Sequence, residues 1–281
     1  MKLIECPRDA MQGIHTFIPT EKKVHYINSL LEVGFDTLDF GSFVSPKAIP
    51  QLRDTVEVLS QLKVSDTKLL AIVANTRGAE EASQHDRITY LGFPLSISET
   101  FQQRNTNKSI AEALNTLDEI QQICLQSNKV LVTYISMGFG NPYGDLYSVD
   151  HVLKMADVLA TMGVAIVSLA DTIGVSQPEQ IENLYSLAVK NFPSIEFGAH
   201  LHSSPQKAWE KIAAAYQAGC QRFDGALKGF GGCPMAEDEL VGNLATEAIL
   251  SFLDSKQAAP DLNRDAFSEA MKIADDVFSY K

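Results

Sequence analysis

Short β-rich segments alternate with amphipathic helical segments along the whole chain, and this alternation limits the folds that the sequence can adopt. The segments expected to form strands are 2–5, 37–40, 68–73, 88–92, 130–135, 165–169, 195–199 and 222–225. The segments expected to form helices are 20–33, 49–62, 76–85, 109–126, 149–162, one that starts near Pro178, 205–218, 240–253 and a last one from about 264 to 279. Repeated strand–helix units imply parallel strands joined by right-handed crossovers.

Eight such units predict a (β/α)8 TIM barrel, for which about 250 residues is a typical length. The prediction is one barrel domain over residues 1–281, with an additional C-terminal helix at about 262–279. The alternative is an open doubly wound sheet, in which a GxGxxG loop follows the first strand. Here the first strand is followed by Cys6-Pro-Arg-Asp-Ala-Met-Gln12, which lacks that loop, so the barrel is favoured.

Charge and cysteine content exclude several classes of partner. The chain carries 35 acidic and 23 basic side chains, a formal net charge of −12. Nucleic acids and membrane surfaces are themselves polyanionic, so neither is expected to bind. No apolar run is long enough to span a bilayer, and the residues after Met1 lack a charged-then-apolar pattern, so a secretion signal is not expected. The four cysteines form no CxxC pair, which is typical of a reducing compartment, and a cytoplasmic location is expected.

Polar side chains gather at the carboxyl ends of the predicted strands, where TIM barrels carry their chemistry. These residues are Arg8, Asp9 and Gln12 after the first strand, Asp39 on the second, Asp171 after the sixth, His200 and His202 at the seventh, and Asn243 after the eighth. Residues two apart on a strand share one face, so the two imidazoles would stand side by side. Together with a carboxylate such as Asp9, they predict a metal site. The alternative is that the histidine pair only fills polar positions at a strand end.

Two further features at this end of the barrel have both a structural and a functional interpretation. Arg8 and Asp9 could form a structural salt bridge, or Asp39 could hold the Arg8 guanidinium and leave Asp9 free for a metal. Cys233 could be a small buried residue, as most free cysteines are. Glycines at 229, 231 and 232 instead favour a flexible loop, on which Cys233 could transfer a proton or act as a nucleophile.

These residues together resemble the 3-hydroxy-3-methylglutaryl-CoA (HMG-CoA) lyase family of metal-dependent barrels. The most specific motif is Lys228-Gly-Phe-Gly-Gly-Cys-Pro234 followed by Gly242-Asn-Leu-Ala-Thr-Glu247. Gly41-Ser-Phe-Val-Ser-Pro-Lys47, Asp171-Thr-Ile-Gly174 and His200-Leu-His202 support it, and the resemblance covers essentially the whole chain.

The resemblance implies cleavage of an acyl-CoA substrate to acetyl-CoA and acetoacetate with a divalent cation, Mg²⁺ or Mn²⁺. Asp9, His200, His202 and Asn243 would ligate or closely support the cation. Arg8 would stabilise the enolate and Cys233 would serve as general acid or base. Gln12 and either Asn105 or Asn107 would face the substrate. A homodimer is expected.

The chain departs from the family pattern near the substrate. Ala10, Gly13 and Ile14 replace the family's usual residues after the arginine–aspartate pair, Asp39 stands for a glutamate, and Ser203-Ser204 follows the histidine pair. Two alternatives to the lyase therefore stay open: a condensing synthase that uses acetyl-CoA, and a repurposed barrel without catalysis.

Overall fold

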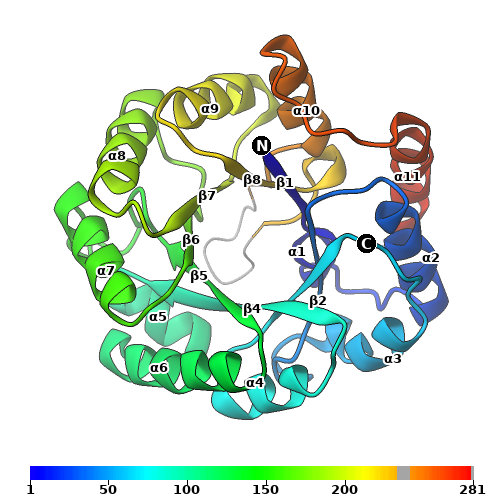
Figure 1. Ribbon diagram of the computed structural model, residues 1–281, viewed down its shortest axis with the longest axis horizontal. Helices are drawn as coiled ribbons and strands as arrows, with labels where there is room; N and C mark the ends of the chain where they lie inside the picture. Colours follow the sequence, from blue (N-terminus) through cyan, green and yellow to red (C-terminus); the bar gives the residue numbers. More distant parts are fainter. Residues whose placement is uncertain (233–240, 280–281) are drawn as a thin grey trace.

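The computed structural model describes residues 1–232 and 241–279 and contains a closed barrel of eight parallel strands, in the order in which they occur in the sequence. Figure 1 looks down this barrel, with the helices arranged around it as an outer ring. The strands are β1 (Lys2–Glu5), β2 (Thr37–Ser42), β3 (Lys68–Ile72), β4 (Ile88–Ser96), β5 (Val130–Ser136), β6 (Ile166–Asp171), β7 (Glu196–Leu201) and β8 (Arg222–Gly225). The barrel closes where β1 pairs with β8, with Lys2 opposite Arg222 and Glu5 opposite Gly225. The predicted (β/α)8 fold is thus confirmed.

Helices follow the strands, and most of them cover the outside of the barrel (Figure 1). They are α1 (Pro7–Gln12), α2 (Thr20–Leu31), α3 (Thr55–Ser60), α4 (Thr76–Ser83), α5 (Glu99–Thr106), α6 (Ile110–Gln126), α7 (Val149–Thr161), α8 (Pro178–Asn191), α9 (Pro205–Gln217), α10 (Thr246–Ser255) and α11 (Arg264–Val277). Two short 3₁₀ helices are η1 (Pro50–Leu52) and η2 (Leu227–Gly229). The predicted additional C-terminal helix is present as α11 and packs against α2. None of the helices in the described part of the chain combines the length and apolar character needed to cross a membrane.

Two predicted helices differ most from their expected bounds, because tertiary contacts interrupt them. The segment 49–62 is split into η1 and α3, since the Thr55 hydroxyl donates to the Leu52 carbonyl at 2.8 Å and accepts from the Ser42 amide at 3.1 Å. The helix expected from residue 240 begins only at Thr246. Residues 243–245, directly before it, are extended, with Asn243 bridged to His202 and Ala245 bridged to Ala226.

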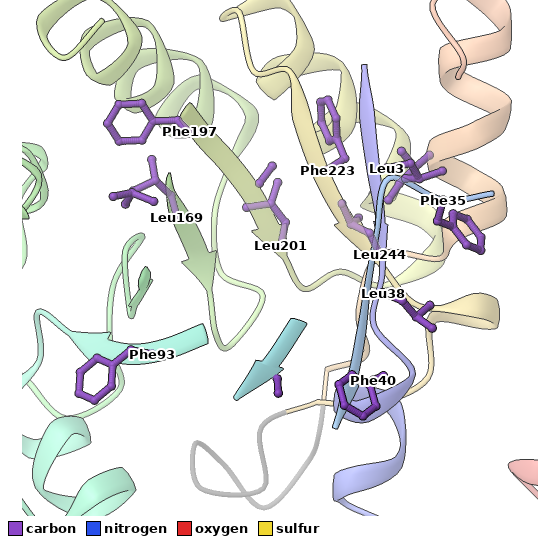
Figure 2. Close-up of a cluster of buried hydrophobic side chains, with 14 of the residues drawn as sticks. Leu3, Phe35, Leu38, Phe40, Phe93, Leu169, Phe197, Leu201, Phe223 and Leu244 are labelled. Carbon is purple, nitrogen blue, oxygen red and sulfur yellow. The ribbon is translucent and has the colours of Figure 1, made fainter. Parts of the chain in front are cut away.

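Apolar side chains on the outward faces of the strands form the main core, between the barrel and its helices. Figure 2 shows part of this layer, with Leu3, Leu38, Leu169, Leu201 and Phe223 among the labelled residues. Because successive side chains of a strand point to opposite faces, the intervening residues point into the barrel. Part of this interior is a separate apolar cluster of Leu70, Ile72, Tyr90, Val132, Tyr134 and Ile166. Other interior positions carry polar side chains, among them Asp39, Ser168, His200, Arg222 and Asp224, and these lead to the site.

Candidate metal and substrate site

A cavity opens at the carboxyl ends of the strands, where the sequence predicts the site. Of the predicted site residues, those that line it are Arg8, Asp9, Gln12, Asn105, His200 and His202. Its wall also includes the apolar residues Val44, Ala48, Ile49, Ile72, Ala74 and Pro94. The cavity therefore combines a charged side with an apolar side, as sites for small organic ligands do.

Arg8 and Asp9 reach the cavity because a short helix, α1, follows directly after β1. Pro7 occupies the first turn of α1, where its missing N–H has no helical partner to lose. Arg8 and Gln12 are four residues apart and lie on the same helix face, so the Arg8 Nη1 group donates to the Gln12 Oε1 atom at 2.8 Å. The local sequence did not predict this helix, which is only six residues long.

Asp39 on β2 holds the Arg8 guanidinium from the other side. Arg8 Nε donates to Asp39 Oδ2 at 3.0 Å and Nη2 donates to the same oxygen at 2.5 Å, and both side chains are buried. Burial raises the pKa of Asp39 to about 6, although the Arg8 charge opposes this shift. Of the five guanidinium N–H groups, Nε–H and one Nη2–H bind Asp39, and the two on Nη1 bind Asp9 and Gln12. The second Nη2–H has no hydrogen-bond partner within the described residues.

Asp9, His200 and His202 form a buried cluster in which one oxygen or nitrogen atom of each lies within 4.8 Å of the others. His202 Nδ1 lies 2.8 Å from the Val241 carbonyl oxygen, which can only accept, so this nitrogen carries the proton. His200 Nδ1 lies 3.2 Å from Asp224 Oδ2. Within residues 1–232 and 241–279, the hydrogen bonds of both histidines are made by Nδ1, which leaves Nε2 to act as a ligand.

The charges of this cluster shift the protonation of all three groups. Burial would raise the pKa of Asp9, but the Arg8 guanidinium and the two imidazoles outweigh burial and lower it. Burial lowers the pKa of His202, and the neighbouring His200 lowers it further. Burial also acts to lower the pKa of His200, but the hydrogen bond and charge of Asp224, together with Asp9, raise it. An ionised carboxylate beside a neutral His202 is the protonation state that a cation requires of its ligands.

The donor set fits a divalent cation. One carboxylate and two imidazoles converge in a buried position, and Asp9 is already oriented by three donors: Arg8 at 2.9 Å, Gln12 at 2.8 Å and Asn243 at 2.7 Å. The Asn243 amide group also donates to the Phe230 carbonyl at 2.9 Å. In this structure Asn243 thus supports Asp9 through its Nδ2 atom.

The remaining predicted residues lie elsewhere. Asn107 is the left-handed C-terminal cap of α5, is exposed and accepts a hydrogen bond from Gln103 at 2.9 Å, so Asn105 is the asparagine that lines the cavity. Cys233 lies outside the described residues. Asp171 accepts from the Val175 and Ser176 amides and pairs with Lys211 at 2.7 Å, which fixes the loop after β6.

Sequence reasoning missed several polar residues that line the cavity or lie beneath it. Tyr134 and Ser136 of β5 and Thr172 after β6 contribute to the cavity wall, and Asp224 of β8 contacts His200. The two-residue period of a strand could have indicated that the strand residues among them face the barrel interior. Tyr134 and Ser136 alternate with the outward-facing Ile135, and Asp224 alternates with the outward-facing Phe223.

Comparisons with known proteins are consistent with this geometry. A family model described as HMGL-like matches residues 3–277. A hydroxymethylglutaryl-CoA lyase of Bacillus subtilis (strain 168) is 33% identical over 267 residues, which is 95% of this chain and 89% of that protein. The mitochondrial hydroxymethylglutaryl-CoA lyase of Rattus norvegicus is 32% identical over 257 residues, which is 90% of this chain and 78% of the rat protein.

Solved structures agree with the sequence relatives. An HMG-CoA lyase from Acinetobacter baumannii, in complex with coenzyme A and 3-methylmalate, superposes with a TM-score of 0.92 at 29% identity, over 100% of this chain and 92% of that one. An HMG-CoA lyase from Pseudomonas aeruginosa gives the same TM-score and identity, over 100% of this chain and 93% of that one. The family model spans nearly the whole chain and relatives exceed 30% identity, and we conclude that the chain belongs to the HMGL-like family.

Proposed function

We propose that this protein is an HMG-CoA lyase, which cleaves HMG-CoA to acetyl-CoA and acetoacetate. The observation that carries the proposal is the buried cluster of Asp9, His200 and His202, with the Arg8 guanidinium bound to Asp9 at the edge of the same cavity. Relatives and solved structures that carry the name HMG-CoA lyase support it. None of those reported above is a condensing synthase, so that alternative is not favoured.

The cleavage is a retro-Claisen reaction with a simple balance of atoms. The 3-hydroxyl loses its proton, the C2–C3 bond breaks, and its electron pair passes to the thioester as an enolate. A proton delivered to C2 then gives acetyl-CoA, while the other fragment leaves as acetoacetate. A Mg²⁺ or Mn²⁺ ion, held by Asp9, His200 and His202, would supply Lewis-acid polarisation of substrate oxygens.

Arg8 is placed to stabilise the negative charge that develops on the thioester oxygen. Asp39 fixes the guanidinium in one orientation, and one Nη2–H remains for a ligand in the cavity. A fixed donor that meets charge only as it forms lowers the barrier more than it strengthens substrate binding. We keep Cys233 as the proposed general acid or base, on the family resemblance.

The cavity wall suggests how the substrate is oriented. Gln12 and Asn105 provide amide groups, and the apolar side chains of Val44, Ala48 and Ile49 offer a surface for the methyl and methylene groups of the acyl chain. Lys47 lies in the same loop and is exposed, so it would meet the phosphates of CoA. The acyl-CoA substrate, the homodimer and the cytoplasmic location stand as parts of this proposal, and light scattering and fractionation would test the last two.

The test is an identification of products. Purified protein with Mg²⁺ and a thiol reductant is incubated with HMG-CoA, and the mixture is analysed by mass spectrometry. The lyase gives equimolar acetyl-CoA and acetoacetate. Release of free CoA from acetyl-CoA plus a 2-oxo acid, with HMG-CoA left intact, would instead identify a condensing synthase. Metal binding without turnover of either substrate set would identify a barrel without this catalysis.

A further inference from the structure

Two charged side chains of β8 lie inside the barrel, directly beneath the metal cluster. Arg222 and Asp224 are two residues apart on one face of the strand, and their exposed fractions are 0% and 2%. Asp224 Oδ2 lies 3.2 Å from His200 Nδ1. A buried carboxylate therefore separates a buried arginine from a proposed metal ligand.

The neighbouring strands leave room for this stack of side chains. Gly198 on β7 has no side chain, and a Cβ atom placed there would lie 2.6 Å from Ser168 Oγ and 3.0 Å from Arg222 Cδ. The Ser168 hydroxyl donates to the same Asp224 oxygen that faces His200, at 3.1 Å. Ser168 thus fixes the carboxylate that His200 meets, and glycine at 198 gives Arg222 and Ser168 their space.

Arg222 supplies a permanent positive charge next to Asp224. Its Nε atom lies 4.0 Å from Asp224 Oδ1, and its Nη1 atom lies 3.6 Å from Glu196 Oε1. None of its three nitrogens makes a hydrogen bond within the described residues. A guanidinium does not lose its proton in a protein, and a buried charge is costly unless an opposite charge is close. Asp224 and Glu196 are the carboxyl groups that lie within 4.0 Å of this guanidinium in the described part of the chain.

We propose that Asp224 is a positioning residue for His200, with Arg222 as its counter-charge. The carboxylate accepts the Nδ1–H of His200, which sets the tautomer and the ring orientation and leaves Nε2 for the cation. His202 is oriented in the same way by the neutral Val241 carbonyl. The two histidines therefore differ in strength as ligands, because a carboxylate makes its imidazole partner more basic than a carbonyl does. The inference rests on the proposed function only in that it assumes a bound cation.

The test measures cation binding and does not depend on turnover. Mn²⁺ is titrated into the metal-free wild type, the Asp224→Asn variant and the Asp54→Asn variant, and its Kd is measured by the electron paramagnetic resonance of free Mn²⁺. Asp54→Asn is the matched control, since Asp54 forms a buried ion pair with Lys23 at 2.7 Å and does not line the cavity. Circular dichroism verifies that each variant is folded.

Asp224→Asn should weaken Mn²⁺ binding by about 10- to 100-fold, the range seen when a residue behind a metal ligand is changed. Asp54→Asn should leave the Kd within about threefold of the wild type while lowering thermal stability. An Asp224→Asn Kd equal to that of the wild type would overturn the inference. Failure of the wild type itself to bind Mn²⁺ would overturn the proposed function, which is a different result.

A second measurement needs no variant. In wild-type protein with ¹⁵N-labelled histidine, the ring nitrogen shifts show which atom carries the proton. The inference requires a protonated Nδ1 atom on His200 and a shift of its Nε2 resonance when a diamagnetic cation, Mg²⁺, is added. A protonated Nε2 atom, or a cation bound at Nδ1, would contradict it even if Asp224→Asn failed to fold.

Discussion

Glu5, the last residue of β1, is a buried carboxyl group whose ionisation should make the protein less stable as pH rises. Its exposed fraction is 0%, and its oxygens contact the Leu227 amide at 2.9 Å and the Thr246 hydroxyl at 2.5 Å. Burial raises the pKa of Glu5 from 4.5 to about 8. In the folded protein the neutral acid can accept from Leu227 and donate to Thr246, so both contacts survive without a charge.

The size of the effect follows from the difference between the two pKa values. The unfolded chain releases the proton near pH 4.5 and the folded chain near pH 8, so the folded state binds more protons between these values. The stability contributed by the neutral acid is fully present below pH 4.5 and is lost as pH rises through 8. Each unit within this window costs about 1.4 kcal/mol of unfolding free energy. From pH 5.5 to 7.5 the loss assigned to Glu5 is about 3 kcal/mol.

Glu5→Gln isolates this contribution, because glutamine is neutral at every pH and can make both contacts. Urea unfolding of the wild type and the variant is followed by circular dichroism at pH 5.5, 6.5 and 7.5. The stability of Glu5→Gln relative to the wild type should increase by about 3 kcal/mol across this range, whatever other groups titrate in both proteins. A constant difference between the two proteins, or one that changes in the opposite direction, would refute the reasoning.

Three further predictions test the site and its support. Arg8→Lys should lower kcat by about 10²- to 10³-fold in a variant that circular dichroism shows to be folded, because an ammonium cannot bind Asp39 as a fork; near-normal turnover would contradict this. Gly198→Ala should lower the urea-derived unfolding free energy by about 1 to 3 kcal/mol, since its Cβ would crowd Ser168 and Arg222; unchanged stability would show that the interior has room. Cys233→Ser should cut turnover strongly with little loss of folding, because a hydroxyl is a weaker acid than a thiol, and a fully active but unstable variant would rule out the catalytic role.

The barrel could be predicted from the sequence because its signal is local and repeated. Each strand and most helices have the expected period, and eight repeats leave few other architectures. The two helices whose predicted bounds were wrong depend on tertiary contacts, which a local sequence pattern does not contain. Residues 243–245 are extended because they pair with His202 and Ala226, and Thr55 interrupts a helix because it binds Ser42.

The site divides in the same way. Asp9, His200 and His202 could be predicted from the sequence because they follow or end predicted strands, and the structure brings them together. Asp224 could not be predicted as a site residue, because a polar residue within a strand is equally compatible with exposure to solvent. Its side chain faces the interior only because the strands close into a barrel. The choice between Asn105 and Asn107 depended on the bounds of α5. Asn105 lies in its last turn and lines the cavity, whereas Asn107 is its left-handed C-terminal cap.

The most direct test of the account compares acetoacetate formation from HMG-CoA by wild-type protein and the His202→Ala variant, each stripped of metal by a chelator and then titrated with Mn²⁺. The account predicts that the stripped wild type is inactive, that Mn²⁺ restores acetoacetate formation, and that His202→Ala stays inactive at Mn²⁺ concentrations that saturate the wild type. Acetoacetate formation by the stripped wild type, or full restoration of His202→Ala by the same Mn²⁺ concentrations, would contradict it.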